Sequence, residues 1–203
     1  MLRLARIVER TRAEGPGVRS ALWVQGCTVR CPGCFNPHTW SRSGGRTWPI
    51  DDVFEALTRS PDIEGVTLLG GEPFDQAHAL AKLAGLVRRK GLSVMAFTGH
   101  TRERLEGLDA PDGAEQLLGQ VDLLVDGPFL LDLPDRQRPW VGSTNQRFHA
   151  LTDIYAKLVP TLDQVDDRLE VKLQRDGQML VNGFADLATV EALLEGLGRR
   201  HRG

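Results

Sequence analysis

The chain has 203 residues, of which 41% are hydrophobic and 26% are charged, and its formal net charge at pH 7 is −2. These values are typical of a soluble globular protein with one full core, and they give no electrostatic reason for nucleic acid as the main partner. Residues 1–15 alternate charged and apolar side chains, which argues against a signal peptide, and no apolar run is long enough to span a membrane. We therefore expect a cytoplasmic protein in a reducing compartment.

Apolar runs and helical periodicities alternate along the first part of the chain. Buried strands are predicted for 20–26, 65–71, 93–99 and 121–127, and helices for 51–60, 74–91 and 101–108. Strands that alternate with helices predict βα units, a parallel sheet and the α/β class. The carboxyl ends of parallel strands meet at one edge of the sheet, so the polar or glycine-rich ends of these strands should form one site.

The chain changes character after residue 150. Residues 169–184 alternate polar and apolar side chains around Asp176–Gly177, which predicts a β-hairpin. In 185–200, apolar side chains recur on one face of a predicted helix. We therefore expect a core domain of residues 1–152 and a C-terminal hairpin-plus-helix addition of residues 153–203.

All three cysteines of the chain, Cys27, Cys31 and Cys34, lie within GCTVRCPGCFNPHTW (26–40), after the first predicted strand. An odd, clustered set argues against a disulfide framework and favours metal binding. Three cysteines can hold three irons of a four-iron cluster and leave the fourth iron open. Together with His38, they can instead form a structural zinc site of three Cys and one His. The cysteines alone favour neither alternative.

The wider sequence separates these alternatives. EGPGVR (14–19), GCTVRCPGCFNPHTW (26–40), LLGGEPF (68–74), LVDGPF (124–129) and WVGSTNQR (140–147) occur in this order. With these motifs the chain resembles the radical S-adenosylmethionine (SAM) enzymes that activate glycyl-radical enzymes, over about residues 14–150. The resemblance implies an open, partial βα barrel, a 4Fe–4S cluster held by the three cysteines, and SAM bound at the open iron.

The resemblance also assigns SAM contacts residue by residue. They are Gly33, Phe35, Gly70, Gly71, Glu72, Thr98, Asp126, Ser143 and Asn145. The paired glycines let the backbone approach a ligand closely, and the carboxylate of Glu72 suits an ammonium group. Plainer interpretations are turn glycines, a core aromatic ring and turn-forming Ser and Asn. Pro128 stands where some members of the family carry a basic residue near Asp126, which leaves Arg147 as the alternative cation.

The function implied by the resemblance is reductive cleavage of SAM to generate a glycyl radical on a partner enzyme, most closely anaerobic ribonucleotide reductase. Flavodoxin or ferredoxin is implied as the electron donor, and no residue is required as a general acid or base. Two alternatives remain open: a radical SAM enzyme that acts on a peptide or small molecule, and a zinc-binding domain without enzymatic activity. The addition after residue 152 is compatible with a different substrate.

Overall fold

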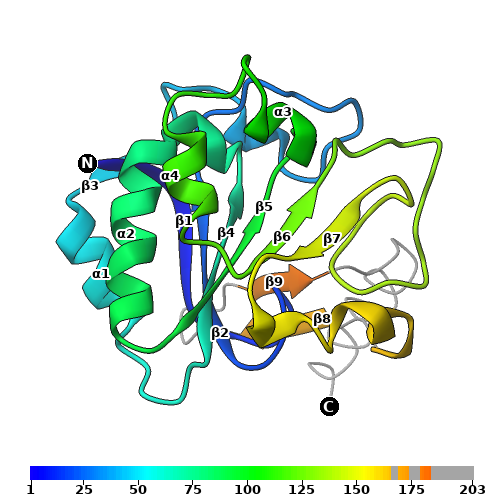
Figure 1. Ribbon diagram of the computed structural model, residues 1–203. Helices are drawn as coiled ribbons and strands as arrows, with labels where there is room; N and C mark the ends of the chain where they lie inside the picture. The colour runs from blue at the N-terminus through cyan, green and yellow to red at the C-terminus, as the bar shows by residue number, and fades with distance from the viewer. Residues whose placement is uncertain (166–168, 174–178, 184–203) are drawn as a thin grey trace, which may run out of the picture.

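The computed structural model describes residues 1–165, 169–173 and 179–183. Its strands are β1 (Leu2–Thr11), β2 (Arg19–Val24), β3 (Arg46–Trp48), β4 (Gly65–Gly70), β5 (Ser93–Phe97), β6 (Leu123–Asp126), β7 (Arg147–Ala150), β8 (Leu169–Leu173) and β9 (Met179–Gly183). Its α-helices are α1 (Ile50–Leu57), α2 (Ala77–Arg89), α3 (Arg102–Glu106) and α4 (Ala114–Leu118). Short 3₁₀ helices are η1 (Pro37–Thr39), η2 (Pro73–Gln76), η3 (Asp153–Tyr155) and η4 (Val159–Gln164). The protein is a mixed α/β structure (Figure 1).

In the described part of the chain, seven strands form one sheet in the order β3-β1-β2-β4-β5-β6-β7. The central strands β2, β4, β5 and β6 are parallel, as the sequence predicts. Strands β1 and β3 on one side of this parallel centre and β7 on the other run antiparallel to their neighbours, which the sequence does not predict. Segments 12–18 and 127–146 connect β1 to β2 and β6 to β7 without a helix, and such connections permit antiparallel pairing.

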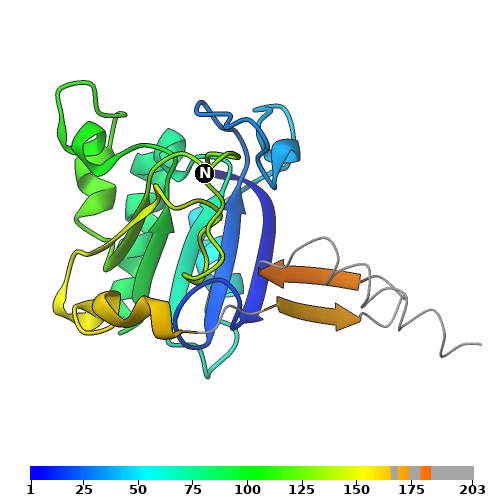
Figure 2. The ribbon, with the colours of Figure 1, turned by 90° about the vertical axis from the view of Figure 1, so that its right-hand side faces the viewer.

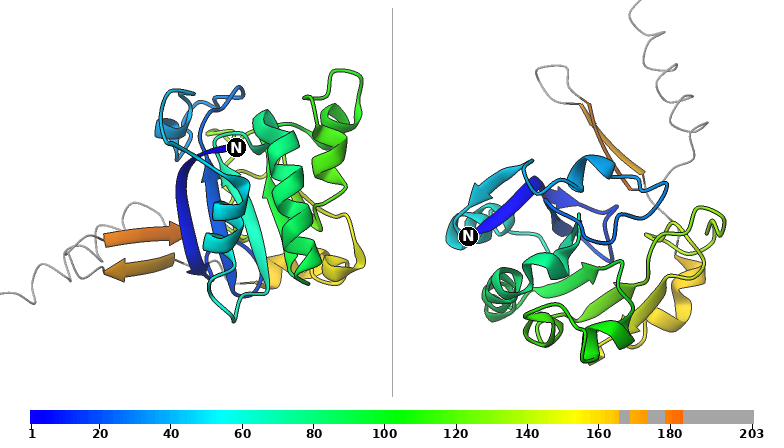
Figure 3. Two further views of the ribbon diagram at one scale, coloured as in Figure 1. Left: turned by 90° about the vertical axis from the view of Figure 1, so that its left-hand side faces the viewer. Right: turned by 90° about the horizontal axis from the view of Figure 1, so that it is seen from above.

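The helices lie on the outer side of the curved sheet, as the view from above shows (Figure 3). Helix α2 buries Leu80, Leu83 and Val87 on one face, at the spacing that the sequence predicts. Beyond its end, Gly91 adopts a positive φ of 81°, a conformation that terminates helices. The buried faces of the helices and the outward side chains of the strands form the main apolar core.

The inner face of the sheet carries a second apolar cluster. Met95, Leu123 and Val125 point to it from β5 and β6, and they pack with Trp140, Val141, Tyr155 and Leu162. Their neighbours Val94 and Leu124 belong to the outer core. Alternate residues of the central strands thus face two different cores, as expected for parallel strands that are buried on both sides.

Strands β8 and β9 form the predicted C-terminal hairpin and pair antiparallel in a separate two-stranded sheet. Figure 2 shows this hairpin beside the β1 side of the large sheet. The predicted turn at Asp176–Gly177 and the predicted helix at 185–200 lie outside the described residues. Within the described residues, β3 and β7 do not pair, so the large sheet is not a closed barrel. No helix in this part of the chain is long and apolar enough to cross a bilayer.

Candidate functional site

The cysteines lie on the loop that follows β2. The N–H of Cys27 donates to the carbonyl of Trp40 at 3.2 Å, which folds the loop back on itself. Two backbone N–H groups point at sulfur: Arg30 N–H donates to Cys27 Sγ at 3.4 Å, and Asn36 N–H donates to Cys34 Sγ at 3.3 Å. Hydrogen bonds of this kind favour the thiolate form and tune the clusters that thiolates hold.

The three cysteines line one cavity together with the ends of the parallel strands. Its volume is about 130 Å³, and its lining includes Cys27, Cys31, Cys34, Gly70, Gly71, Glu72, Thr98, Gly99, Gly127, Phe129 and Gln146. The prediction that the ends of these strands form one site is therefore confirmed. A larger cavity of about 750 Å³ lies between β1, β3 and α1, and no cysteine lines it.

The donor set of the cysteine cavity consists of thiols without an imidazole. His38 is exposed in η1 and does not line this cavity. Among the described residues, no group of three or more His, Cys, Asp or Glu side chains is placed to hold a metal ion. A zinc site of three Cys and one His needs all four side chains together, and His38 does not lie with the three cysteines around this cavity. Free thiols distributed around one cavity are instead the donors that an iron–sulfur cluster takes.

Burial raises the pKa of the Cys27 and Cys31 thiols, and the nearby carboxylate of Glu72 raises both further. In the metal-free chain these two thiols therefore favour the protonated form. A cation among them reverses this balance, because a thiol that coordinates a metal is deprotonated.

Glu72 lies between the ends of β4 and β5 and is 1% exposed. Its Oε1 accepts hydrogen bonds from Phe74 N–H and Thr98 Oγ1, both at 2.9 Å, and its Oε2 accepts one from Gly99 N–H at 2.9 Å. Burial raises the pKa of Glu72 to about 7, although these hydrogen bonds favour the ionised form. A carboxylate offers about four acceptor positions, so one position remains for a donor in the cavity.

Gly70 and Gly71 are required by the packing of the chain itself. Gly70 has a φ of 110°, and a Cβ built on it would lie 2.6 Å from the Cα of Trp23. A Cβ on Gly71 would lie 2.0 Å from the carbonyl oxygen of Gly26. The missing side chains thus let the cysteine loop lie directly on the end of β4. Both glycines line the cysteine cavity, and a contact between their backbone and a cofactor stays a prediction.

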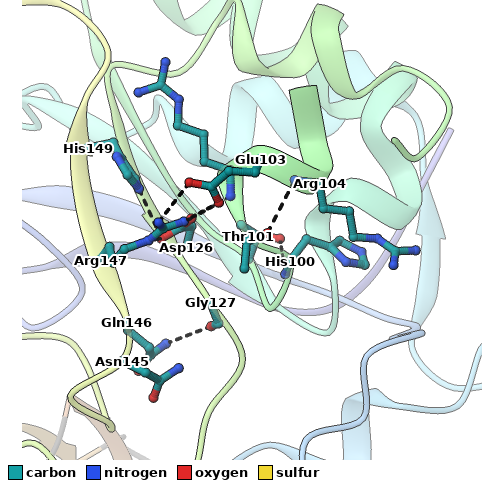
Figure 4. A network of polar contacts seen from close by, with 12 residues as sticks. His100, Thr101, Glu103, Arg104, Asp126, Gly127, Asn145, Gln146, Arg147 and His149 are labelled. Carbon is teal, nitrogen blue, oxygen red and sulfur yellow. Dashed lines mark hydrogen bonds and ion pairs between the residues drawn. The ribbon is translucent and has the colours of Figure 1, made fainter. Parts of the chain in front are cut away.

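Asp126, at the end of β6, lies inside a cluster of charges (Figure 4). It accepts hydrogen bonds from Arg102 N–H at 2.6 Å and Arg147 Nε at 3.0 Å, and His149 Nε2 lies 3.1 Å away. Burial alone would raise the pKa of Asp126, but the hydrogen bonds from Arg147 and Arg102 hold it below its usual value. Arg147 also pairs with Glu103. Both Asp126 and Arg147 are engaged with protein groups, and neither lines the cysteine cavity.

Ser143 and Asn145 make contacts within the 127–146 segment. Ser143 Oγ accepts from Leu130 N–H at 3.1 Å, and Asn145 Nδ2 donates to the carbonyl of Pro128 at 2.8 Å. Neither side chain lines the cysteine cavity, although the Oδ1 atom of Asn145 is buried without a hydrogen-bond partner among the residues that the structure describes. Their direct partners are therefore backbone groups of their own segment.

Gly33 and Phe35 lie at the outer side of the cysteine loop. Gly33 has a φ of 76°, and a Cβ on it would lie 3.2 Å from the side chain of Leu131. The ring of Phe35 is 60% exposed and packs on Phe129 with 5.1 Å between ring centroids. Phe35 is therefore a surface residue at the entrance, and its interpretation as a core aromatic is wrong.

A second cavity of about 330 Å³ adjoins the cysteine cavity. Gly70, Phe97, Phe129 and Gln146 line both. The other lining residues of the second cavity include the aromatic residues Trp23, Phe35 and Trp140 and the polar residues Arg6, Glu14 and Asn36. Sequence reasoning missed Phe129 and Gln146 as site residues. Both lie inside the motifs LVDGPF and WVGSTNQR, and this position was the available signal.

Residues 13–149 match the family model of a 4Fe-4S single cluster domain. The chain is also similar to proteins named anaerobic ribonucleoside-triphosphate reductase-activating protein. The protein of Vibrio cholerae is 36% identical over 147 residues, which cover 68% of this chain and 92% of the relative. That of Escherichia coli K12 is 31% identical over 149 residues, with the same coverage of both chains. That of Pasteurella multocida is 36% identical over 150 residues, which cover 68% of this chain and 91% of the relative.

Proposed function

Because this chain belongs to the family of anaerobic ribonucleoside-triphosphate reductase-activating proteins, we propose that it is a radical SAM activase that generates a glycyl radical on such a reductase. One observation carries the proposal: three free thiols and the buried carboxylate of Glu72 line the same cavity, at the carboxyl ends of the parallel strands. This combination suits an iron–sulfur cluster with an ammonium-bearing ligand beside it.

In this proposal Cys27, Cys31 and Cys34 hold a 4Fe–4S cluster and leave one iron for SAM. When bound, the two cofactors would supply one-electron chemistry: reductive cleavage of a carbon–sulfur bond of SAM and removal of a hydrogen atom from the glycine Cα. Flavodoxin or ferredoxin provides the electron. The chain itself needs no general acid or base for this reaction, and its residues bind, orient and shield the reactants.

The carboxylate of Glu72 has one acceptor position that its three protein donors do not use, and in the proposal it receives the ammonium group of SAM. Thr98 positions this carboxylate, since its hydroxyl donates to Glu72 and accepts from His100 N–H at 3.1 Å. The backbone of Gly70 and Gly71 lies beside the same ligand.

The other predicted SAM residues are proposed to act at the rim of the site. Phe35 lines the adjoining cavity and offers a ring to the adenine. Gly33 lets the cysteine loop turn beneath the side chain of Leu131. The remaining residues, Asp126, Ser143 and Asn145, hold the end of β6 and the 127–146 segment in place.

The curved sheet with helices on its outer side supports a partial barrel whose inner face is the reaction chamber (Figure 3). We propose the division into a core of residues 1–152 and an addition of residues 153–203. A cytoplasmic location follows from the same chemistry, because thiols and iron–sulfur clusters persist where the environment is reducing.

The test is anaerobic reconstitution with iron and sulfide, followed by dithionite, SAM and the large subunit of an anaerobic ribonucleotide reductase. We expect one four-iron cluster per chain, formation of 5′-deoxyadenosine, and a glycyl-radical signal in electron paramagnetic resonance of the large subunit. Alanine at Cys27, Cys31 or Cys34 should abolish all three. The matched control is His38→Ala, which should retain them. Loss of metal binding in His38→Ala, or a colourless zinc protein, would overturn the proposal.

A further inference from the structure

The β8–β9 hairpin is attached to the core through specific polar contacts, although it lies beyond the segment 13–149 that matches the family model. Glu170 in β8 accepts from Thr11 Oγ1 at 2.6 Å and from Arg12 N–H at 3.0 Å. At the end of β9, the N–H of Gly183 donates to Glu14 Oε1 at 3.1 Å. The hairpin is thus held along β1 and the segment that follows it.

This attachment brings the hairpin to the wall of the second cavity. Gly183 lines that cavity together with Arg6 and Glu14. The guanidinium of Arg6 lies over the ring of Trp23, 4.6 Å from its centroid, and its terminal nitrogen donates to Oδ1 of Asn182 in β9. One end of the cavity is therefore built jointly by β1, β2 and the hairpin.

Two hydrogen-bond donors near this end have no partner among the described residues. The Nε of Arg6 and the Nδ2 of Asn182 are buried and make no hydrogen bond within that part of the chain. Asn182 is 3% exposed and lies next to Gly183, which lines the cavity. Buried donors without acceptors are costly and rare in folded proteins, so a pair of them beside a cavity points to a ligand with oxygen acceptors.

The position of these donors distinguishes between two possible ligands. The cysteine cavity is lined by neither Arg6 nor Gly183, and the residues shared by the two cavities lie between these donors and the cysteines. In the proposed function SAM reaches the cluster and its adenine reaches Phe35, so SAM occupies the cysteine cavity, the shared part and the Phe35 side of the second cavity. The far end remains for the second reactant, a polypeptide segment with glycine at its centre. An extended segment presents carbonyl oxygens at regular intervals, and glycine adds no side chain that would collide with aromatic walls.

We propose that the β8–β9 hairpin closes the substrate end of the second cavity, where Arg6 Nε and Asn182 Nδ2 donate to main-chain carbonyl oxygens of the glycine-bearing segment of the reductase. This inference rests on the proposed function and assigns its substrate site. It also gives the hairpin a direct part in recognition of the partner.

The test uses the full-length reconstituted protein and two conservative variants. Asn182→Asp keeps the Oδ1 acceptor for Arg6 but replaces the free donor with an acceptor. Arg6→Lys keeps the positive charge but removes the Nε donor. The matched control is Gln116→Glu, the same amide-to-carboxylate change at an exposed position of α4. The readouts are SAM affinity, 5′-deoxyadenosine formation without reductase, KM for the reductase large subunit, and anaerobic binding of that subunit without SAM.

For Asn182→Asp we expect the KM for the large subunit to rise about tenfold. The variant loses one hydrogen bond and places a carboxylate oxygen opposite the carbonyl oxygen of the bound segment. SAM affinity and uncoupled cleavage should stay within about twofold of wild type, and Gln116→Glu should match wild type throughout. Unchanged KM and binding of the large subunit in both variants would overturn the inference. A fall in SAM affinity in both variants would overturn it as well, since the donors would then serve SAM. If the wild type itself cleaves no SAM, the proposed function fails. Binding of the large subunit without SAM then tests the role of the hairpin separately: weaker binding by Asn182→Asp than by wild type supports it, and equal binding overturns it.

Discussion

Glu72→Gln tests whether burial controls the charge of the carboxyl group at the centre of the site. Burial raises the pKa of Glu72 from 4.5 to about 7 in the folded chain. Between these pH values the folded state holds a proton that the unfolded state has lost. The unfolded state therefore binds fewer protons, and the free energy of unfolding must fall as pH rises from about 4.5 to about 7.

The magnitude follows from the difference between the two pKa values. A difference of about 2.5, at about 1.4 kcal/mol for each pKa unit, gives a loss of about 3 kcal/mol between pH 4.5 and pH 8. Gln does not titrate, so the variant should lack this loss. At pH 5 the variant should be less stable by about 1–3 kcal/mol, because its amide group sets N–H donors against the N–H of Gly99 or the hydroxyl of Thr98.

The assay is urea unfolding of the reduced, metal-free chain, followed by tryptophan fluorescence at several pH values between 5 and 8. The stability gap between wild type and Glu72→Gln should be widest at pH 5 and should close or reverse by pH 8. Glu115→Gln, at an exposed position of α4, is the control and should follow wild type. Parallel stability curves for wild type and Glu72→Gln would refute the claim that burial dominates the three hydrogen bonds.

Two further predictions concern the supports of the site. Gly71→Ala should displace the cysteine loop from the end of β4, because its Cβ would lie 2.0 Å from the Gly26 carbonyl oxygen. The control Gly91→Ala has no described atom within 4 Å of its Cβ and should lower the free energy of unfolding by only about 1–2 kcal/mol, from its positive φ. Iron content after reconstitution should be low in Gly71→Ala and normal in Gly91→Ala, and equal iron in both variants would contradict the prediction. Tyr155→Phe removes the hydroxyl that accepts a hydrogen bond from Arg19 at 2.8 Å. It should lower the free energy of unfolding in urea titrations by about 1–3 kcal/mol and leave SAM affinity unchanged. Wild-type stability of the variant would show that this hydrogen bond does not stabilise the fold.

The parallel centre of the fold and the ends of its strands were accessible from the sequence. Strand β4 ends at Gly70, two residues before Glu72, and β5 ends one residue before Thr98. Because parallel strands carry their carboxyl ends to one edge, local patterns sufficed to bring these residues together. The three hydrogen bonds of Glu72 were not accessible, since they depend on the register of β4 against β5 and on burial that only the folded chain defines.

The antiparallel strands escaped prediction for local reasons. Residues 1–15 alternate charged and apolar side chains, but the register of β1 shifts between Leu4 and Arg6, so the alternation does not continue in phase along the strand. Strand β7 has only four residues, Arg147–Ala150, too few for a periodic pattern. Strand β1 carries Arg6, which lines the second cavity, and β7 carries Arg147, which pairs with Asp126. The contacts that the sequence did not predict are therefore those made by the antiparallel strands of the sheet.

The two ends of the paired cavities are built by different kinds of contact, and under the proposed function this difference bears on how the protein would select its partner. At the cysteine end, main-chain hydrogen bonds from Gly71 N–H to Val24 and from Glu72 N–H to Gly26, both 2.9 Å, fix the loop. These main-chain contacts require glycine at position 71, where the backbone lies against the Gly26 carbonyl, and otherwise do not depend on which side chains are present. At the far end the walls include the side chains of Arg6 and Glu14, and Gly183 is supplied by a hairpin outside the family match. A change of residue there alters what the cavity accepts and leaves the main-chain support of the cysteine loop in place. In the proposed function, specificity for the glycine-bearing protein could therefore vary at the hairpin end while the three cysteines keep their positions.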